Sequence, residues 1–343
     1  MNNRIKTLQK RLNQWKIDAL IIENPIDLLY LTGLKLSKGR LWLWPDRVEL
    51  CVDGRYFGEA SQKSACPVTL WVKGKESNHQ GSIGFDSAWT TIANLERLKK
   101  ESPFAVWASI NGPLTEQRLI KDAKEIETLC EAAKITWAGI ERVQSLFRED
   151  VSEQDLAFEF EFFIRKCGAS RLAFDTIVAF GENSAYPHHR SSPARLQNNQ
   201  IILIDAGAVF NNYCADVTRV FFFGTPDPRL EQMFRFVRDA YNAARRQIKA
   251  GAKIQTVDQA VRDSFAQAGV ESLFTHSLGH GLGLEGHEPP LIRWDGDDRE
   301  MAIQSQLVIA IEPGLYQPGL GGVRYENSGV VTKNGFESFY PEE

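Results

Sequence analysis

Three apolar stretches of the chain each carry an acidic residue where a buried strand is expected. Asp205 directly follows four aliphatic residues in IILIDAGAVF, Glu312 follows a similar run in LVIAIEPGLY, and Glu326 lies within VRYENSGVV. Burying a lone carboxylate costs several kcal/mol unless it is paired or binds a cation. One such residue is most simply a carboxylate that caps a turn or pairs with an arginine. Three of them in one region predict a common partner.

The stretch IILIDAGAVFNNYCADVTRVFFF adds a fourth carboxylate to this group. If residues 211–212 form a two-residue hairpin turn, Phe210 pairs with Tyr213. Asp205 and Asp216 are then diagonal neighbours on one face of the ribbon, with α-carbons about 7–8 Å apart. A longer loop or a bulge would place them on opposite faces. The hairpin therefore predicts two converging carboxylates.

The segment HSLGHGLGLEGHEPP holds three of the six histidines, at 276, 280 and 287, among four glycines. It is either a flexible polar loop or a metal site, because neutral imidazole is a common metal ligand. The glycines argue against a helix, and the HExxH zinc signature is absent. Five histidines (188, 189, 276, 280 and 287) lie in the second part of the chain, whereas His79 lies in the polar stretch KGKESNHQG and is predicted to be solvated.

Asp205, Asp216, His280, Glu312 and Glu326 together offer four carboxylates and one imidazole. This oxygen-rich set favours manganese or another hard divalent ion over a structural zinc cage. Two divalent ions would balance four negative charges, and such a pair lowers the pKa of a shared water enough for hydrolysis near neutral pH. Arg324, two residues before Glu326, would face the same way and is either a partner of the site or a structural ion pair.

The length of 343 residues predicts two domains. Helical spacing of apolar residues is found near the start and over residues 126–140, and Ser152, Asp155 and Gly168 delimit a further helix. A break at SINGPL gives a boundary between residues 113 and 114.

A net charge of −4 excludes a basic nucleic-acid surface. Without a signal or a spanning segment, the chain is expected in the cytoplasm, with no membrane partner, and its five scattered cysteines are expected to be reduced.

The ordered motifs IDAGA, YCADVTR, HSLGHGLGLEGHE, IEPGLY and GGVRYEN resemble those of the Xaa-Pro peptidase family, the relatives of methionine aminopeptidase. NPIDLLYLTGL and VDGRYF resemble the family's creatinase-type N-terminal domain. The resemblance implies an α+β chain, with a smaller creatinase-type α/β domain at 1–113 and a pita-bread catalytic domain at 114–343. It also implies a homodimer.

The resemblance assigns roles to individual residues. The five residues that supply the carboxylates and the imidazole match the ligands of a binuclear centre, with Asp216 and Glu326 bridging and manganese expected, or else cobalt, zinc or iron. His188, His287, Glu312 and Arg324 match catalytic residues, and His276 and Tyr316 match substrate-binding residues. His189 is predicted to be solvated or packed, and Cys214 to be a buried small residue.

The family's activities leave several functions open. The first is an Xaa-Pro aminopeptidase, which cleaves an N-terminal residue from a following proline. The alternative is an Xaa-Pro dipeptidase, which must hold the free carboxylate of proline, for which arginine is the natural partner. In HEPPLI, Leu291 occupies the position where many dipeptide-cleaving relatives have a basic residue, and Arg293 could replace it. We therefore predict the aminopeptidase. More remote alternatives are a creatinase-like C–N hydrolase and a binding module that has lost its ligands.

Overall fold

A computed structural model describes residues 3–71 and 79–342. The chain forms two compact units that divide between Gln117 and Arg118; the sequence had suggested a boundary four residues earlier. Among the described helices, none combines the length and the apolar character needed to cross a membrane.

The first unit is built on a mixed six-stranded sheet with strand order β4-β3-β2-β1-β5-β6. β1 pairs antiparallel with β2 and parallel with β5, and β2 and β3 form an antiparallel hairpin. The prediction that His79 is solvated is wrong, because its ring lies against two tryptophans. The ring centroids are 4.1 Å apart for His79 and Trp42 and 5.4 Å apart for His79 and Trp44. The elements are α1 (Asn3–Trp15), β1 (Ala19–Ile22), α2 (Pro25–Thr32), β2 (Arg40–Leu43), β3 (Val48–Val52), α3 (Phe57–Lys63), β4 (Val68–Leu70), β5 (Gly81–Asp86), α4 (Ile92–Glu101), β6 (Ala105–Ile110) and, at the junction of the units, α5 (Thr115–Leu119).

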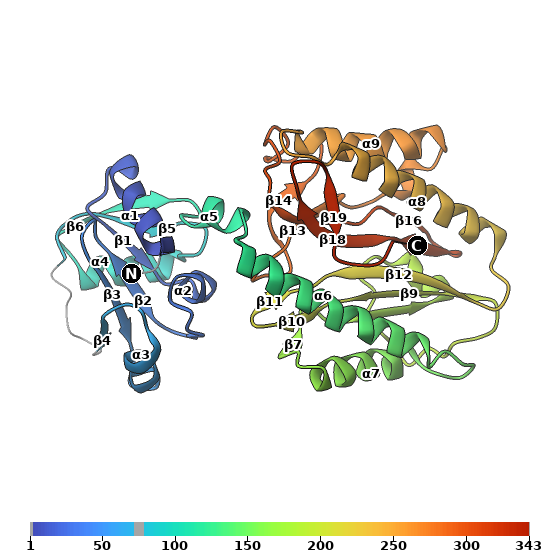
Figure 1. Cartoon of the computed structure of the whole chain (residues 1–343), viewed down its shortest axis with the longest axis horizontal. Coiled ribbons are helices and arrows are strands. Elements are labelled where there is room, and N and C mark those ends of the chain that lie inside the picture. The colour runs from blue at the N-terminus through green and yellow to red at the C-terminus, as the bar shows by residue number, and fades with distance from the viewer. Residues whose placement is uncertain (1–2, 72–78, 343) are drawn as a thin grey trace. The chain divides into compact units, whose positions relative to one another are not determined.

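The second unit encloses an antiparallel sheet between two pairs of helices (Figure 1). The strand order is β14-β13-β15-β18-β12-β9-β8, and β19 also pairs with β18. The helices are α6 (Ala123–Gln144), α7 (Glu153–Lys166), α8 (Pro228–Gln247) and α9 (Ile254–Gln267), with 3-10 turns η1 (Gly181–Ala185) and η2 (Glu271–Leu273). The sheet strands are β8 (Ile177–Phe180), β9 (Gln200–Ala206), β12 (Val217–Phe223), β13 (Gly279–Gly281), β14 (Glu288–Ile292), β15 (Val308–Ile311), β18 (Glu326–Val331) and β19 (Phe336–Ser338). Smaller pairings involve β7 (Arg171–Leu172), β10 (Ala208–Phe210), β11 (Tyr213–Cys214), β16 (Gly314–Gln317) and β17 (Gly321–Arg324).

The side chains of β9 alternate between the two helical layers. Ile201 and Leu203 pack in the core that includes α8 and α9, whereas Ile202 and Ile204 pack in the core that includes α6 and α7. A strand buried on both faces has no polar side, which explains its continuous aliphatic run. By the same alternation, Asp205 belongs to the face of Leu203.

Capping motifs set the helix starts that lead into this core. Asp122 and Glu125 form a capping box on α6, and Ser152 and Asp155 form one on α7, as the sequence predicted for the second helix. Gly168 follows α7 with a φ of 102°, a left-handed conformation that suits glycine at a helix end.

Candidate metal centre

The predicted hairpin register is confirmed. Phe210 pairs with Tyr213, and the turn residues Asn211 and Asn212 have φ values of 45° and 73°, as a type I′ turn requires. Asp205 pairs with Thr218 on β12. The pairs on either side of Asp216, Val209 with Cys214 and Ala206 with Val217, keep the same register. Asp216 is therefore diagonal to Asp205, and both carboxylates lie on one face.

The sheet places three carboxylates in one row across four strands. Thr218 of β12 pairs with Asp205 of β9 on one side and with Glu326 of β18 on the other. Ile311 of β15 pairs with Asn327, and Glu312 is the next residue, so extending that register by one residue sets Glu312 opposite Glu326. Neighbouring strands are about 4.8 Å apart, which brings carboxylates from distant sequence positions within reach of shared cations.

His280 lies on β13 beside this row. Its Nε2 atom is 3.6 Å from Asp216 Oδ2 and 3.8 Å from Glu312 Oε1. Its Nδ1 atom donates to the carbonyl oxygen of Gly281 at 3.0 Å. The Nε2 lone pair is therefore free to bind a metal ion. One ligand atom each from Asp216, His280 and Glu326 lies within 4.8 Å of the others.

Burial makes this cluster electrostatically unfavourable without a cation. Burial, together with the charges of Glu326, Asp205 and Glu312, raises the pKa of Asp216 well above its ordinary value. Burial and Glu326 do the same to the pKa of Glu312, and burial and Asp205 raise the pKa of Glu326 to about 8. Burial also lowers the pKa of His280 to about 4, so its imidazole is neutral. The buried Oδ1 of Asp205 has no hydrogen-bond partner within the described residues. This donor set fits divalent metal ions.

Arg324 connects the carboxylates to a buried hydrogen-bond chain. Its guanidinium donates to Asp205 Oδ2 at 2.6 Å, to Tyr316 Oη at 2.8 Å and to Thr218 Oγ1 at 3.0 Å. Thr218 in turn donates to Glu326 at 2.7 Å. The sequence predicts that Arg324 faces the same way as Glu326. In the structure its ion-pair partner is Asp205, and Thr218, which no sequence pattern singles out, connects it to Glu326.

The same chain fixes His276. Tyr316 Oη accepts from Arg324, so it donates to His276 Nε2, 2.9 Å away, and His276 Nδ1 donates to the carbonyl oxygen of Ser277 at 2.7 Å. Burial and the charge of Arg324 lower the pKa of His276 to about 4. His276 is therefore neutral and held in one tautomer.

A cavity of about 300 Å³ opens over the cluster. His188 is exposed at the cavity wall, and the ring of His287 lies 3.9 Å from that of His280. Leu291 also lines the cavity. Of the predicted site residues, Tyr316 alone is absent from the lining, and it contacts the site through His276 and Arg324.

Three neighbouring residues lie outside the cluster of candidate ligands. His189 bonds through Nε2 to the buried Glu153 at 2.8 Å, in agreement with a packed residue. Cys214 is buried, as predicted, and burial raises the pKa of its thiol to about 12. Arg293 forms an ion pair with Asp295 and is not part of the cavity lining.

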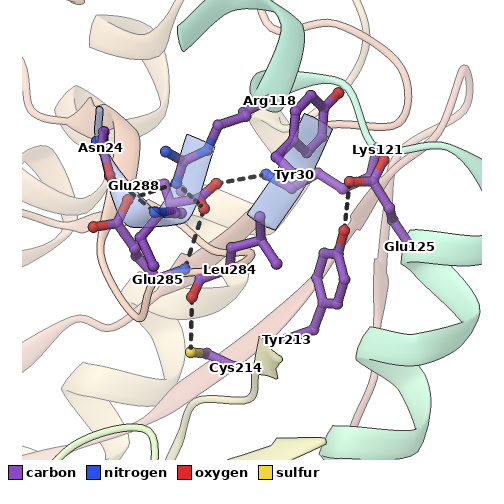
Figure 2. Close-up of polar contacts among 12 residues, drawn as sticks. Asn24, Tyr30, Arg118, Lys121, Glu125, Tyr213, Cys214, Leu284, Glu285 and Glu288 are labelled. Carbon is purple, nitrogen blue, oxygen red and sulfur yellow. Dashed lines mark hydrogen bonds and ion pairs between the residues drawn. The ribbon is translucent and has the colours of Figure 1, made fainter. Parts of the chain in front are cut away.

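A buried ion network that the sequence did not reveal supports the histidine segment (Figure 2). Glu288, next to His287, accepts from Arg118 at 2.6 Å and from Lys121 at 3.2 Å. Glu288 packs against Gly283, where an added Cβ would lie 2.6 Å from the carboxylate. This close approach explains one glycine of GLGLEGHE.

Loss of the Glu288 charge is expected to destabilise the folded protein. Lys121 is 1% exposed, and removing one partner of a buried pair costs about 3–5 kcal/mol. Glu288→Gln should therefore lower the free energy of unfolding by that amount in urea denaturation of the metal-loaded protein. Glu285→Gln is the matched control, because Glu285 pairs with Arg118 but is 46% exposed in its side chain, and its loss should cost less than about 1 kcal/mol. Equal effects of the two variants would contradict a structural role for the buried pair.

Comparison with known proteins agrees with this architecture. Residues 127–333 match the model of metallopeptidase family M24, and residues 4–120 match the creatinase/prolidase N-terminal domain. The chain is 32% identical to an Xaa-Pro dipeptidase from Pyrococcus horikoshii, over 98% of this chain and 96% of the relative. It is similar to the solved Xaa-Pro dipeptidase from Bacillus anthracis, with a TM-score of 0.94 at 31% identity, covering 99% of this chain and 98% of that one. The X-Pro aminopeptidase from Thermotoga maritima has a TM-score of 0.89 at 29% identity, covering 97% and 98%.

The fold and these matches define a metallopeptidase with a pita-bread catalytic domain and a creatinase-type N-terminal domain. The chain belongs to metallopeptidase family M24, within the Xaa-Pro peptidases. The family and fold predicted from the sequence are therefore confirmed. Membership in this family implies divalent metal ions, whose identity it does not specify.

Proposed function

We propose that this metallopeptidase is an Xaa-Pro dipeptidase, or prolidase, that hydrolyses the bond between the two residues of a dipeptide ending in proline. The observation that carries the proposal is a cavity of about 300 Å³ that is lined by the carboxylate row and His280. Its volume is near the lower end of the range for ligand sites. Relatives that match nearly the whole chain and are named Xaa-Pro dipeptidases support the same choice.

This proposal replaces the aminopeptidase predicted from Leu291. That prediction assumed that a cavity without a basic residue at this position has little to gain from a free carboxylate. The dipeptidase relatives instead favour the alternative. A binding module without catalysis is disfavoured because all five ligand candidates surround the cavity.

The ligands in the proposed centre are Asp205, Asp216, His280, Glu312 and Glu326. We include two divalent ions per chain, with manganese preferred because most of the donors are carboxylate oxygens. Bound there, the ions would polarise the scissile carbonyl group and lower the pKa of a water molecule. A homodimer is also part of the proposal, on the family resemblance alone, and the cytoplasmic location stays the expectation drawn from the sequence.

The surrounding residues would bind and orient the substrate. His188, exposed in the cavity, would donate a hydrogen bond to the carbonyl oxygen as negative charge develops on it. Glu312 would accept the proton released by water, and His287 would contact the substrate beside His280. Arg324 and Tyr316 would keep Asp205 and His276 in place through the hydrogen bonds described above.

Peptide length tests the proposal directly. The kcat/KM of an Xaa-Pro dipeptide is expected to exceed that of the same sequence extended by several residues by at least about tenfold, equivalent to about 1.4 kcal/mol of transition-state discrimination. The measurement should be made with manganese and with cobalt. Extended peptides that are cleaved as well as the dipeptide, or better, would restore the aminopeptidase prediction.

A further inference from the structure

We propose that Arg190 binds the free carboxylate of the substrate's proline and so determines the preference for dipeptides. The inference rests on the proposed dipeptidase function and names the residue responsible for it. A dipeptide differs from a longer peptide by a negative charge at proline. Selecting it requires a cation that faces the cavity and is free to bind a carboxylate.

The position of Arg190 is fixed by its neighbour His189. His189 bonds to Glu153, which is fully buried at the start of α7. Glu153 also accepts hydrogen bonds from the backbone N–H groups of Phe180 and Ser192. These bonds tie the chain on both sides of residues 188–190 to one buried carboxylate. His188 and Arg190, on either side of His189, are exposed and line the cavity.

Arg190 and Arg324 are the two arginines among the described residues that line this cavity. Arg324 is 2% exposed, and its guanidinium already binds Asp205, Tyr316 and Thr218. Arg190, in contrast, is exposed and has no hydrogen bond or ion pair to any other residue that the structure describes. Its planar guanidinium can bind a carboxylate with two parallel hydrogen bonds.

Other candidates near the cavity do not fit this role. Arg293 is bound to Asp295 and is not among the cavity-lining residues. Leu291 lines the cavity, but its side chain is apolar and 41% exposed. The uncommitted positive charge at this cavity therefore belongs to Arg190, which lies two residues from His188.

The test compares Ala-Pro with Ala-Pro-amide, which lacks only the negative charge. It uses the metal-loaded wild type, Arg190→Gln and Arg190→Lys, with Arg293→Gln as the matched control. We expect wild type to prefer the acid, and Arg190→Gln to lower kcat/KM for the acid by about tenfold or more, mainly through KM. Cleavage of the amide should stay nearly unchanged. Arg190→Lys should keep part of the preference, and Arg293→Gln should keep all of it.

The outcomes separate this inference from the function on which it rests. If wild type prefers the acid and Arg190→Gln retains that preference with normal metal content, Arg190 is not the carboxylate-binding residue. An equal loss with acid and amide would also overturn the assignment, because it would show a general effect on the site. A wild type that cleaves acid, amide and extended peptides equally well would instead overturn the dipeptidase proposal.

Discussion

Removal of the divalent ions is expected to abolish peptide hydrolysis and to destabilise the protein most at alkaline pH. Without a cation, burial and Asp205 raise the pKa of Glu326 from 4.5 to about 8 in the folded state. Between these values the unfolded chain loses a proton that the folded chain retains, so the free energy of unfolding falls as pH rises. The raised pKa values of Asp216 and Glu312 act in the same direction. The lowered pKa values of His276, His280 and His287 act in the opposite direction below the ordinary histidine pKa of 6.5, so the decrease is expected above that pH.

Melting temperatures of metal-free and metal-loaded protein at pH 7 and pH 8 check this expectation, because the histidines are largely neutral in both the folded and the unfolded state in this range. The stabilisation by metal should be larger at pH 8 than at pH 7, and should reach about 4 kcal/mol for each bound ion when free metal exceeds its Kd a thousandfold. Elemental analysis of the reconstituted protein should give two ions per chain. Saturation at one ion with full activity would contradict the binuclear centre, and a metal-free protein that is more stable at pH 8 than at pH 7 would contradict the electrostatic argument.

His188→Ala is expected to reduce kcat by about a hundredfold or more while metal content stays unchanged. The side chain is exposed at the cavity and belongs to none of the ligand groups found around His280. Removing one hydrogen-bond donor to the developing charge of a transition state has an effect of this size. Steady-state kinetics, elemental analysis and thermal melting of the same preparation separate catalysis from binding and folding.

Two results for His188→Ala would contradict a catalytic role for this side chain. Near-normal turnover would make it one more residue of the cavity wall and would remove it from the mechanism. Lost metal would show that the variant disturbs the ligands. A decrease in kcat with normal metal content and a normal melting temperature would support the role proposed for its imidazole.

The site could be predicted from the sequence where its geometry is local. Two asparagines fixed the hairpin turn, and the period of two along each strand then placed Asp205 and Asp216 on one face. Aliphatic runs ending in Asp205 and Glu312 indicated buried carboxylates, because burial without compensation is too costly to occur by chance in several strands. The order of the motifs along the chain indicated the protein family.

Only the tertiary structure decided which distant residues meet. The row through Asp205, Thr218 and Glu326 depends on the pairing of β9, β12 and β18, and strand order is not written in any one strand. Glu288 binds Lys121 across 167 positions of the chain. Nothing in the local pattern around either residue indicates its partner, because a charged side chain next to a turn looks the same whether it ends in water or in a buried ion pair. The sequence therefore determined the strands and the faces of the chemical groups, and long-range packing decided their contacts.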